Sequence, residues 1–205
     1  MQSRGLGQPP AARRAPGYHV RSMSDQVTLR PVAEEDLAVI ERLTNDPDGT
    51  GEHDWHGWHD PHVWGHRWAE NGLMGSAAGT LMIIDGTGPV GFVSWRQVGT
   101  GPISFCWELG IAIAAEARGQ GVGTEAQQQV VRYLFRHTQV NRIQAGTEIT
   151  NLAEQRALEK AGFTREGVLR GVTFRDGRWR DGVIYSVLRE EVDLSGSARA
   201  AGGTP

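Results

Sequence analysis

The stretch from Trp107 to Arg136 constrains the fold most, because it predicts a strand, a glycine-rich turn and a helix in direct succession. From Trp107 to Ala114 large and small residues alternate, as the pleat of a β-strand requires. The large residues share one face of this strand; they are Trp107, Leu109, Ile111 and Ile113. The other face, with Glu108, Gly110 and Ala112, is nearly bare, so a ligand could lie against the backbone there.

The turn that follows reads Arg118-Gly119-Gln120-Gly121-Val122-Gly123 and leads into a helix. Apolar residues recur every four positions on one helical face, at Val122, Ala126, Val130 and Leu134. The helix therefore begins inside the glycines. Its first amide groups have no intrahelical acceptors, the helix dipole adds partial positive charge, and glycines let an anion approach the backbone closely. This pattern predicts a ligand that carries phosphates.

Several other interpretations of the turn can be weighed. A P-loop requires Gly, four residues, and then Gly-Lys with Ser or Thr, but no lysine follows these glycines. A dinucleotide fingerprint requires G-x-G-x-x-G, whereas Gly119, Gly121 and Gly123 are spaced two apart, and no strand with an acidic residue follows at the right place. A glycine-rich connection that binds no ligand remains an alternative.

The turn reads R-x-x-G-x-G, and it resembles the pyrophosphate-binding turn of the GNAT superfamily of acyl-CoA-dependent N-acyltransferases. Two more segments carry the resemblance. Asn151 to Phe163, followed by Arg-Glu-Gly167, is similar to the second helix and following strand of the RimJ/RimL-like branch, and Val27 to Asp36 resembles its opening strand and helix. The chain is identified as a member on these three separated segments, which together extend from Val27 to Glu191.

The resemblance agrees with the order of elements that the whole sequence predicts. This order is strand, two helices, three strands, helix, strand, helix and two strands, which is an α/β layer arrangement. We expect the GNAT acyltransferase fold, with a central mixed and twisted sheet of about seven strands flanked by about four helices. Residues 27–194 would form a single N-acetyltransferase domain. Residues 1–26 are expected to be a disordered N-terminal extension and residues 195–205 a disordered tail.

Composition limits the partners and the compartment. The chain has 205 residues and a formal net charge of −3, which does not suggest a nucleic-acid partner. The lone Cys106 cannot form an internal disulfide, and it is a better candidate for a small buried hydrophobe than for a nucleophile. No signal peptide and no run of eighteen apolar residues is present, so we expect no membrane partner and a cytoplasmic location. Assembly into a homodimer is left open.

The resemblance implies acetyl-CoA as co-substrate. Its pyrophosphate would bind the backbone amides from Arg118 to Thr124, namely Arg118, Gly119, Gln120, Gly121, Val122, Gly123 and Thr124. Its pantetheine chain would pair along Ile111, Ala112 and Ile113, and Asn151 would contact the pantetheine or thioester region. Two alternatives stay open: Arg118 as an ordinary surface arginine, and Asn151 as a helix N-cap whose capping-box partner is Glu154.

Acetyl transfer to an amine needs a group that takes up a proton. Glu108 is the expected base because it shares the bare side of the strand with Gly110; the alternative is an ion pair with an arginine from a neighbouring strand. The proton donor to the thiolate is open, since relatives carry Ser where this chain has Glu154. Tyr185 is a candidate donor, and a buried structural tyrosine is the alternative.

The segment from Glu52 to Trp68 is the most unusual in composition. It contains five of the seven histidines and four of the seven tryptophans of the chain. We expect a substrate-binding lid, in which Trp55 and Trp58 offer flat faces to a cationic acceptor and Glu52 and Asp54 attract an amine. A solvated loop is an alternative. A metal site is another, but no metal is expected, because a run broken by glycine and proline lacks the helical pairing of ligands; its candidate ligands are His53, His56, His59, His62, Asp54 and Asp60.

The sequence therefore predicts an acetyl-CoA-dependent N-acetyltransferase. The acetyl group would pass by direct attack on the thioester to a primary amine of a small molecule, antibiotic-like or polyamine-like, or to a protein N-terminus. The alternative is a catalytically silent acyl-CoA-binding or regulatory protein with the same fold.

Overall fold

The computed structural model describes residues 27–195 of the chain; the expected N-terminal extension, and the expected tail from residue 196 on, lie outside the described residues. The strands are β1 (Thr28–Pro31), β2 (Ala78–Asp85), β3 (Gly88–Gly99), β4 (Phe105–Ile113), β5 (Arg142–Glu148), β6 (Thr164–Arg175) and β7 (Arg178–Leu188). The helices are α1 (Leu37–Asn45), α2 (Pro47–Thr50), α3 (Val63–Asn71), α4 (Val122–His137) and α5 (Leu152–Lys160). Short 3₁₀ turns occupy Glu34–Asp36, Ala115–Ala117 and Arg189–Glu191.

All seven strands form one sheet in the order β1-β2-β3-β4-β5-β7-β6. Neighbouring strands are antiparallel except β4 and β5, which run parallel at the centre. The mixed seven-stranded sheet expected from the sequence is confirmed. The last two strands form a hairpin, in which Asp176 and Gly177 both adopt positive φ angles, of 50° and 73°, as a two-residue turn requires.

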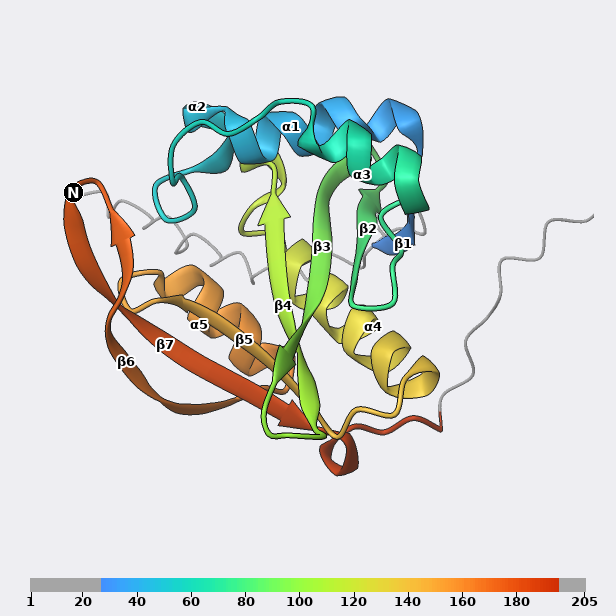
Figure 1. Cartoon of the computed structure of the whole chain (residues 1–205), viewed down its shortest axis with the longest axis vertical. Helices are drawn as coiled ribbons and strands as arrows, with labels where there is room; N and C mark the ends of the chain where they lie inside the picture. The colour runs from blue at the N-terminus through green and yellow to red at the C-terminus, as the bar shows by residue number, and fades with distance from the viewer. Residues whose placement is uncertain (1–26, 196–205) are drawn as a thin grey trace, which may run out of the picture.

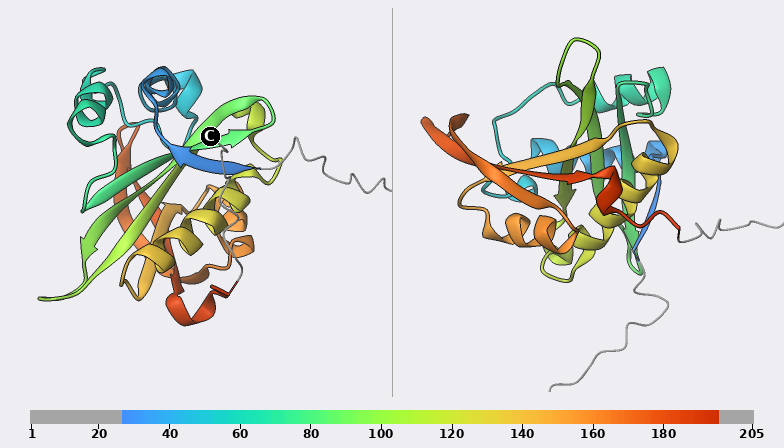
Figure 2. Two further views of the ribbon diagram at one scale, coloured as in Figure 1. Left: turned by 90° about the vertical axis from the view of Figure 1, so that its right-hand side faces the viewer. Right: turned by 90° about the horizontal axis from the view of Figure 1, so that it is seen from below.

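Helices cover both faces of the sheet (Figure 2). On one face, α4 packs its apolar stripe against a large core that includes Trp107 and Leu109 of β4. On the other face, which carries α1, α2 and α3 and is called the front face below, Ile40 and Leu43 of α1 pack near Ala114. The alternation expected along β4 is therefore confirmed. Five helices form rather than four, because the single turn α2 separates from α1 at Pro47, which cannot continue a helix hydrogen-bond pattern.

The two central strands separate, and this separation positions the site. The ladder between β4 and β5 runs from Trp107–Ile143 to Leu109–Ala145 and ends there. Both strands continue beyond this point, β4 to Ile113 and β5 to Glu148, and they diverge (Figure 1). The result is a V-shaped opening at the centre of the sheet, with Leu109 and Ala145 at its closed end.

Candidate active site

The glycine turn forms one end of a groove of about 650 Å³. Gly119 and Gly121 have φ angles of 74° and 84°, in the left-handed region where a side chain is strained. Gly121 is the N-cap of α4, and the first hydrogen bond of the helix joins the Glu125 amide to the Gly121 oxygen at 3.1 Å. The amides of Val122, Gly123 and Thr124 precede this bond and have no partner inside the helix, so they are available to an anion.

The walls of this groove come from β4 and α5. Ile111, Ala112 and Ile113 line one wall, where β4 has already lost β5 as its ladder partner. The opposite wall is the N-terminal part of α5, from Asn151 to Ala157. The groove is therefore elongated, with strand backbone along one side and anion-binding amides at one end. This shape fits a chain-like ligand that ends in phosphates.

Arg118 holds two parts of the groove together. Its Nε donates to the Ile113 oxygen at 2.8 Å, and its Nη2 donates to the backbone oxygens of Gly49 at 3.1 Å and Thr50 at 3.3 Å. The guanidinium thus connects the end of β4 to the end of α2. This role differs from both sequence-based interpretations, since Arg118 serves as a tether and lines the groove at the same time.

Asn151 is a helix N-cap, the alternative considered from the sequence, and it also lies in the groove. Its Oδ1 accepts from the Glu154 amide at 3.2 Å, so Asn151 caps α5. It also lines the groove beside Thr150 and Leu152. Its expected contact with the ligand stays a prediction.

Glu154 is the titratable group whose pKa departs furthest upward among the groove-lining residues. It lies in the first turn of α5, and its Oε1 accepts from Gln127 Nε2 of α4 at 2.6 Å. Loss of solvent raises the pKa of this carboxyl to about 7, and the negative charge of Asp54 adds to the effect. A carboxyl with such a pKa can hold or release a proton near neutral pH.

The His/Trp segment contributes only its first part to the groove. Glu52, His53 and Asp54 line it, and the walls that replace water around Asp54 raise the pKa of that carboxyl. Trp55 and Trp58 stack edge to face with centroids 5.7 Å apart, but neither lines the groove, and 79% of Trp58 is exposed. Their contact with an acceptor stays a prediction.

The segment does not gather its histidines into a ligand set. Within residues 27–195, no group of three or more His, Cys, Asp and Glu side chains could hold a metal ion. The ring centroids of His62 and His66 are 6.2 Å apart with their planes tilted by 41°, while His53 lines the groove instead.

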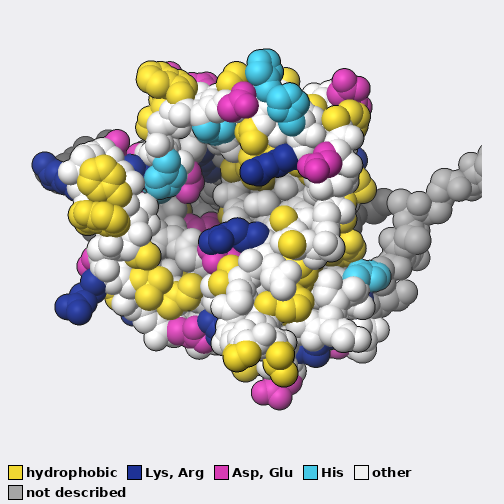
Figure 3. Space-filling view, viewed as in Figure 1, with side chains coloured by type: hydrophobic (Ala, Val, Ile, Leu, Met, Phe, Trp, Pro, Cys, Tyr) yellow, Lys and Arg dark blue, Asp and Glu magenta, His cyan; other side chains and the backbone are white. Residues whose placement is uncertain are grey.

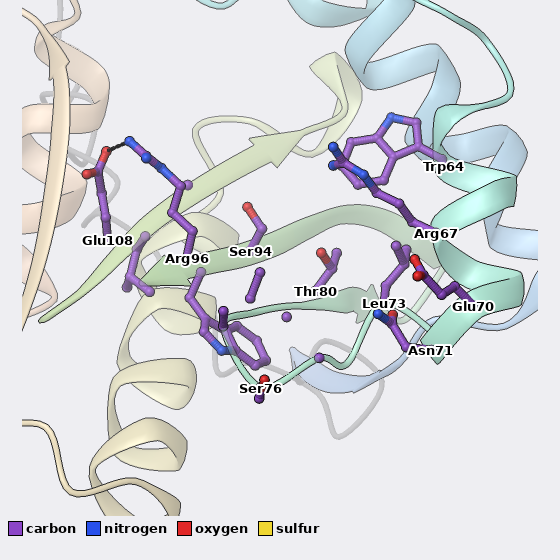
Figure 4. Close-up of a pocket in the computed structure, with 17 residues that line it drawn as sticks. Trp64, Arg67, Glu70, Asn71, Leu73, Ser76, Thr80, Ser94, Arg96 and Glu108 are labelled. Carbon is purple, nitrogen blue, oxygen red and sulfur yellow. Dashed lines mark hydrogen bonds and ion pairs between the residues drawn. The ribbon is translucent and has the colours of Figure 1, made fainter. Parts of the chain in front are cut away.

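Glu108 lies outside this groove and is paired. Its Oε1 accepts from Arg96 Nη2 at 2.8 Å, directly across the β3–β4 ladder, and its Oε2 accepts from Gln144 at 3.3 Å. The carboxylate lines a second hollow of about 640 Å³, on the front face between β3, β4 and α3 (Figure 4). Glu108 therefore forms the ion pair with a neighbouring-strand arginine that was the alternative to its role as base. A catalytic role for Glu108 would require this pair with Arg96 to open.

Tyr185 is not at the groove, so its expected role as proton donor does not fit its position. The residue is fully buried in the core on the side of α4 and α5. Its hydroxyl donates to Glu159 Oε1 at 3.2 Å, and burial raises the pKa of the phenol. The buried structural alternative describes Tyr185 better. Cys106, also fully buried, fits the interpretation as a small hydrophobe.

Three residues that the sequence did not single out contribute to the site. Gln127 is a buried polar residue on the apolar face of α4, and Glu148 and Arg175 form a buried pair at the ends of β5 and β6. A glutamine within an apolar helical stripe indicates a buried polar residue, so the sequence pattern could have identified Gln127. Nothing in the sequence pairs Glu148 with Arg175, because they are 27 residues apart.

The front face of the molecule is hollowed near its centre, and cationic, acidic and histidine side chains surround the hollow (Figure 3). The bare positions of the two diverging strands belong to this face. Glu108 contacts Gln144 there, so Gly110 on β4 and Gly146 on β5, each two residues further, share the same side. Both glycines are exposed. A ligand can reach the V-shaped opening from this face.

A mixed sheet whose central strands diverge, beside a glycine turn whose free amides can bind phosphates, defines the fold class of the N-acetyltransferases. A family model described as an acetyltransferase (GNAT) domain matches residues 26–164 of the chain. The chain belongs to this family, and the membership expected from its three motifs is confirmed.

Individual relatives agree with this assignment. A probable N-acetyltransferase of Bacillus subtilis (strain 168), YjcK, is 34% identical over 102 residues, which cover 50% of this chain and 56% of the relative. The ribosomal protein uS5 alanine N-acetyltransferase of Escherichia coli (strain K12) is 30% identical over 98 residues, 48% of this chain and 50% of the relative. The chain spans about half the length of the curated relatives it matches.

A solved structure shows that the likeness in fold extends further along the chain. Spermidine N-acetyltransferase from Vibrio cholerae, in complex with CoA and spermine, matches with a TM-score of 0.68 and 22% identity, over 81% of this chain and 97% of that chain.

Within the described residues, no helix is long and apolar enough to cross a membrane.

Proposed function

We propose that this protein transfers an acetyl group from acetyl-CoA to a primary amine. The observation that carries the proposal is the meeting of two features in one groove: the open helix start at Gly121 and the strand edge that β4 exposes after Leu109. Phosphates suit the first feature and an amide-containing chain suits the second. A glycine turn that merely connects two elements would need neither the groove nor the exposed strand edge.

The donor groups fit acetyl-CoA in chemistry and position. The amides of Val122, Gly123 and Thr124 would hold the pyrophosphate, together with the turn residues Arg118 to Gly121. The backbone of Ile111 to Ile113 would pair with the pantetheine amides. Bound acetyl-CoA supplies an activated acetyl thioester, and the divergence of β4 from β5 leaves room for that end of the ligand in the sheet.

Two acidic residues on the covering segment of the groove favour a cationic acceptor beside them. Glu52 and Asp54 lie on this segment, whereas the basic residues that line the groove, Arg118, Arg156 and Lys160, lie on the glycine turn and on α5. Carboxylates that face one cavity attract a protonated amine by Coulomb interaction. One solved neighbour is named for spermidine and one relative for an alanine of a ribosomal protein. A small polyamine-like or antibiotic-like molecule or a protein N-terminus remains the class of acceptor.

Glu154 is suited to return a proton to the sulfur. The thiolate that leaves when the C–S bond breaks has an ordinary thiol pKa of about 8.5, so it ends protonated at neutral pH. A carboxyl with a pKa of about 7 in the groove wall is partly protonated under these conditions. Gln127 keeps this carboxyl oriented through its hydrogen bond of 2.6 Å.

A thiol-release assay with acetyl-CoA and a panel of amines tests the proposal. The panel contains spermidine, aminoglycosides and peptides with free N-termini, and a parallel thermal-shift titration measures acetyl-CoA binding. We expect binding and amine-dependent thiol release. Binding without release for every amine would favour the silent acyl-CoA-binding alternative, and absence of binding would contradict the proposal altogether.

A further inference from the structure

His53 lines the groove, and its ring has an acidic neighbour on each side. It lies on the segment after α2, within the covering part of the groove. Its Nε2 is 3.2 Å from Glu52 Oε1, and its Nδ1 is 3.7 Å from Glu148 Oε2. Nδ1 is buried and makes no hydrogen bond within the described part of the chain. The imidazole thus lies between two carboxylates with one ring nitrogen unsatisfied.

Glu148 is fixed beneath His53 and cannot easily turn away. Arg175 donates to both of its oxygens at 2.8 Å, from Nε and from Nη2, and Thr150 donates a third hydrogen bond at 3.2 Å. The side chains of Glu148 and Arg175 are 5% and 7% exposed. These bonds keep the pKa of the Glu148 carboxyl below its ordinary value, so the negative charge under the imidazole is permanent near neutral pH.

The position of this pair relative to the opening in the sheet is informative. Gln144, Gly146 and Glu148 alternate along β5 and share the front face with Gly110 of β4. Gly110 and Gly146 leave the front of the V-shaped opening bare, and Glu148 is the next front-facing residue toward its open end. His53 therefore lies on the side from which a second substrate approaches the diverging strands.

We propose that His53 accepts the proton of the acceptor amine during acetyl transfer, with Glu148 as its positioning residue. The proposal rests on the proposed function. The acceptor reacts as the neutral amine, after its ammonium proton has left to solvent. As the amine nitrogen bonds to the acetyl carbon, the C–S bond breaks, sulfur keeps the electron pair, and one N–H proton passes to His53 Nε2. The imidazolium that results places its two N–H groups against the carboxylates of Glu52 and Glu148.

The geometry suits this protonated form. A charge-assisted N–H···O bond is about 2.7 to 2.9 Å long, so a shift of about 1 Å would close the present 3.7 Å gap at Nδ1. Glu52 is 85% exposed and can turn away from Nε2 when substrate enters. Imidazole is the side chain that most often serves as a general base in enzymes. By contrast, both oxygens of Glu108 already accept hydrogen bonds.

The test compares His53→Gln with His66→Gln, whose parent histidine is exposed on α3 and away from the groove. For His53→Gln we expect kcat to fall by about 10²- to 10⁴-fold while KM for acetyl-CoA and the acetyl-CoA thermal shift stay unchanged. His66→Gln should retain wild-type turnover. Added imidazole should restore part of the activity of His53→Ala, an effect that a purely structural role would not produce.

The experiment distinguishes a failure of the His53 assignment from a failure of the proposed acetyltransferase function. A wild type that binds or turns over nothing contradicts the proposed function. A wild type that turns over normally, with His53→Gln within threefold of it, overturns only the assignment of His53. Failure of imidazole to restore any activity to a folded, acetyl-CoA-binding His53→Ala would also overturn it. Glu148→Asp, which keeps the charge at a shorter reach, should lower kcat without loss of the thermal shift.

Discussion

Arg118 Nη2 donates to the backbone oxygen of Gly49 at 3.1 Å, which joins the glycine turn to a segment 69 residues earlier in the chain. The same guanidinium holds the Ile113 oxygen at the end of β4. One side chain thus joins the glycine turn at one end of the groove to the segment that leads into its cover. If both proposed substrates bind in the groove, their binding should depend on this connection.

We therefore expect Arg118→Met to raise KM for acetyl-CoA and for the amine together. The lost hydrogen bonds to backbone oxygens are worth about 1 to 3 kcal/mol in all, which corresponds to about 5- to 150-fold. Arg118→Lys is the matched control, because it keeps the charge but cannot reach three carbonyls with a planar fork. Steady-state kinetics would contradict the tether if the lysine variant matched the wild type and only the methionine variant weakened acetyl-CoA binding.

Negative charge at Gly123 should prevent acetyl-CoA binding without harm to the fold. A Cβ there would meet Ile111 and Ile113 at ordinary distances of 3.8 and 3.9 Å, and an acidic group suits the first turn of a helix. At a hundredfold excess over its dissociation constant, acetyl-CoA should stabilise the wild type by about 2.7 kcal/mol. Thermal shift should find this gain lost in Gly123→Glu and partly kept in Gly123→Gln. Equal loss in both variants would point to bulk rather than to phosphate repulsion.

Glu108→Gln tests the base expected from the sequence. The Arg96–Glu108 pair is partly exposed, with 67% and 28% of the two side chains accessible, so its removal should change the free energy of unfolding by less than about 1 kcal/mol. If His53 is the proton acceptor, the variant should turn over within about threefold of the wild type. A fall in kcat of about 10²-fold or more, with normal acetyl-CoA binding, would restore Glu108 to the catalytic role.

The raised pKa of Glu154 makes a prediction about stability and pH. Between pH 4.5 and about 7 the folded state keeps a proton that the unfolded state has lost, so stability falls as pH rises through this window. Glu154→Gln removes this loss, and it should be more stable than the wild type by about 1 to 3 kcal/mol at pH 8 but not at pH 4. Urea unfolding at the two pH values measures the difference.

Glu166→Gln is the control variant, because the contribution of Glu166 to stability depends on pH in the opposite direction. Arg142 and Ser186 lower the pKa of the Glu166 carboxyl to about 2, so its contribution is present above pH 4.5 and is lost as pH falls toward 2. This variant should be destabilised at pH 8 and should approach the wild type near pH 2. A Glu154→Gln variant that shows no gain at pH 8 would contradict the raised pKa.

Local patterns in the sequence, together with the family resemblance, predicted the elements of the fold. The alternation along Trp107 to Ile113, the four-residue repeat of α4 and the Asp176-Gly177 turn each specify one element, and the structure forms all three. The divergence of β4 from β5 was not predictable in this way. It depends on where a parallel ladder stops, and no residue pattern near Leu109 and Ala145 marks that point.

The residues proposed for proton transfer were harder to predict from the sequence than the glycine turn. Glu108 shares a strand face with Gly110 as expected, but a cross-strand arginine, Arg96, occupies it. His53 was named only as a candidate metal ligand, and what distinguishes it is the contact with Glu148, 95 residues later, at the end of β5. Long-range pairs of this kind exist only once the sheet has formed.

A crystal structure of the protein with bound CoA would test the account most directly. We predict the pyrophosphate on the amides of the turn from Gly119 to Thr124, and the pantetheine along Ile111 to Ile113. The sulfur should lie in the opening between β4 and β5, within reach of the Glu154 carboxyl. CoA bound in the hollow beside Arg96, or with its sulfur directed away from the diverging strands, would contradict the account.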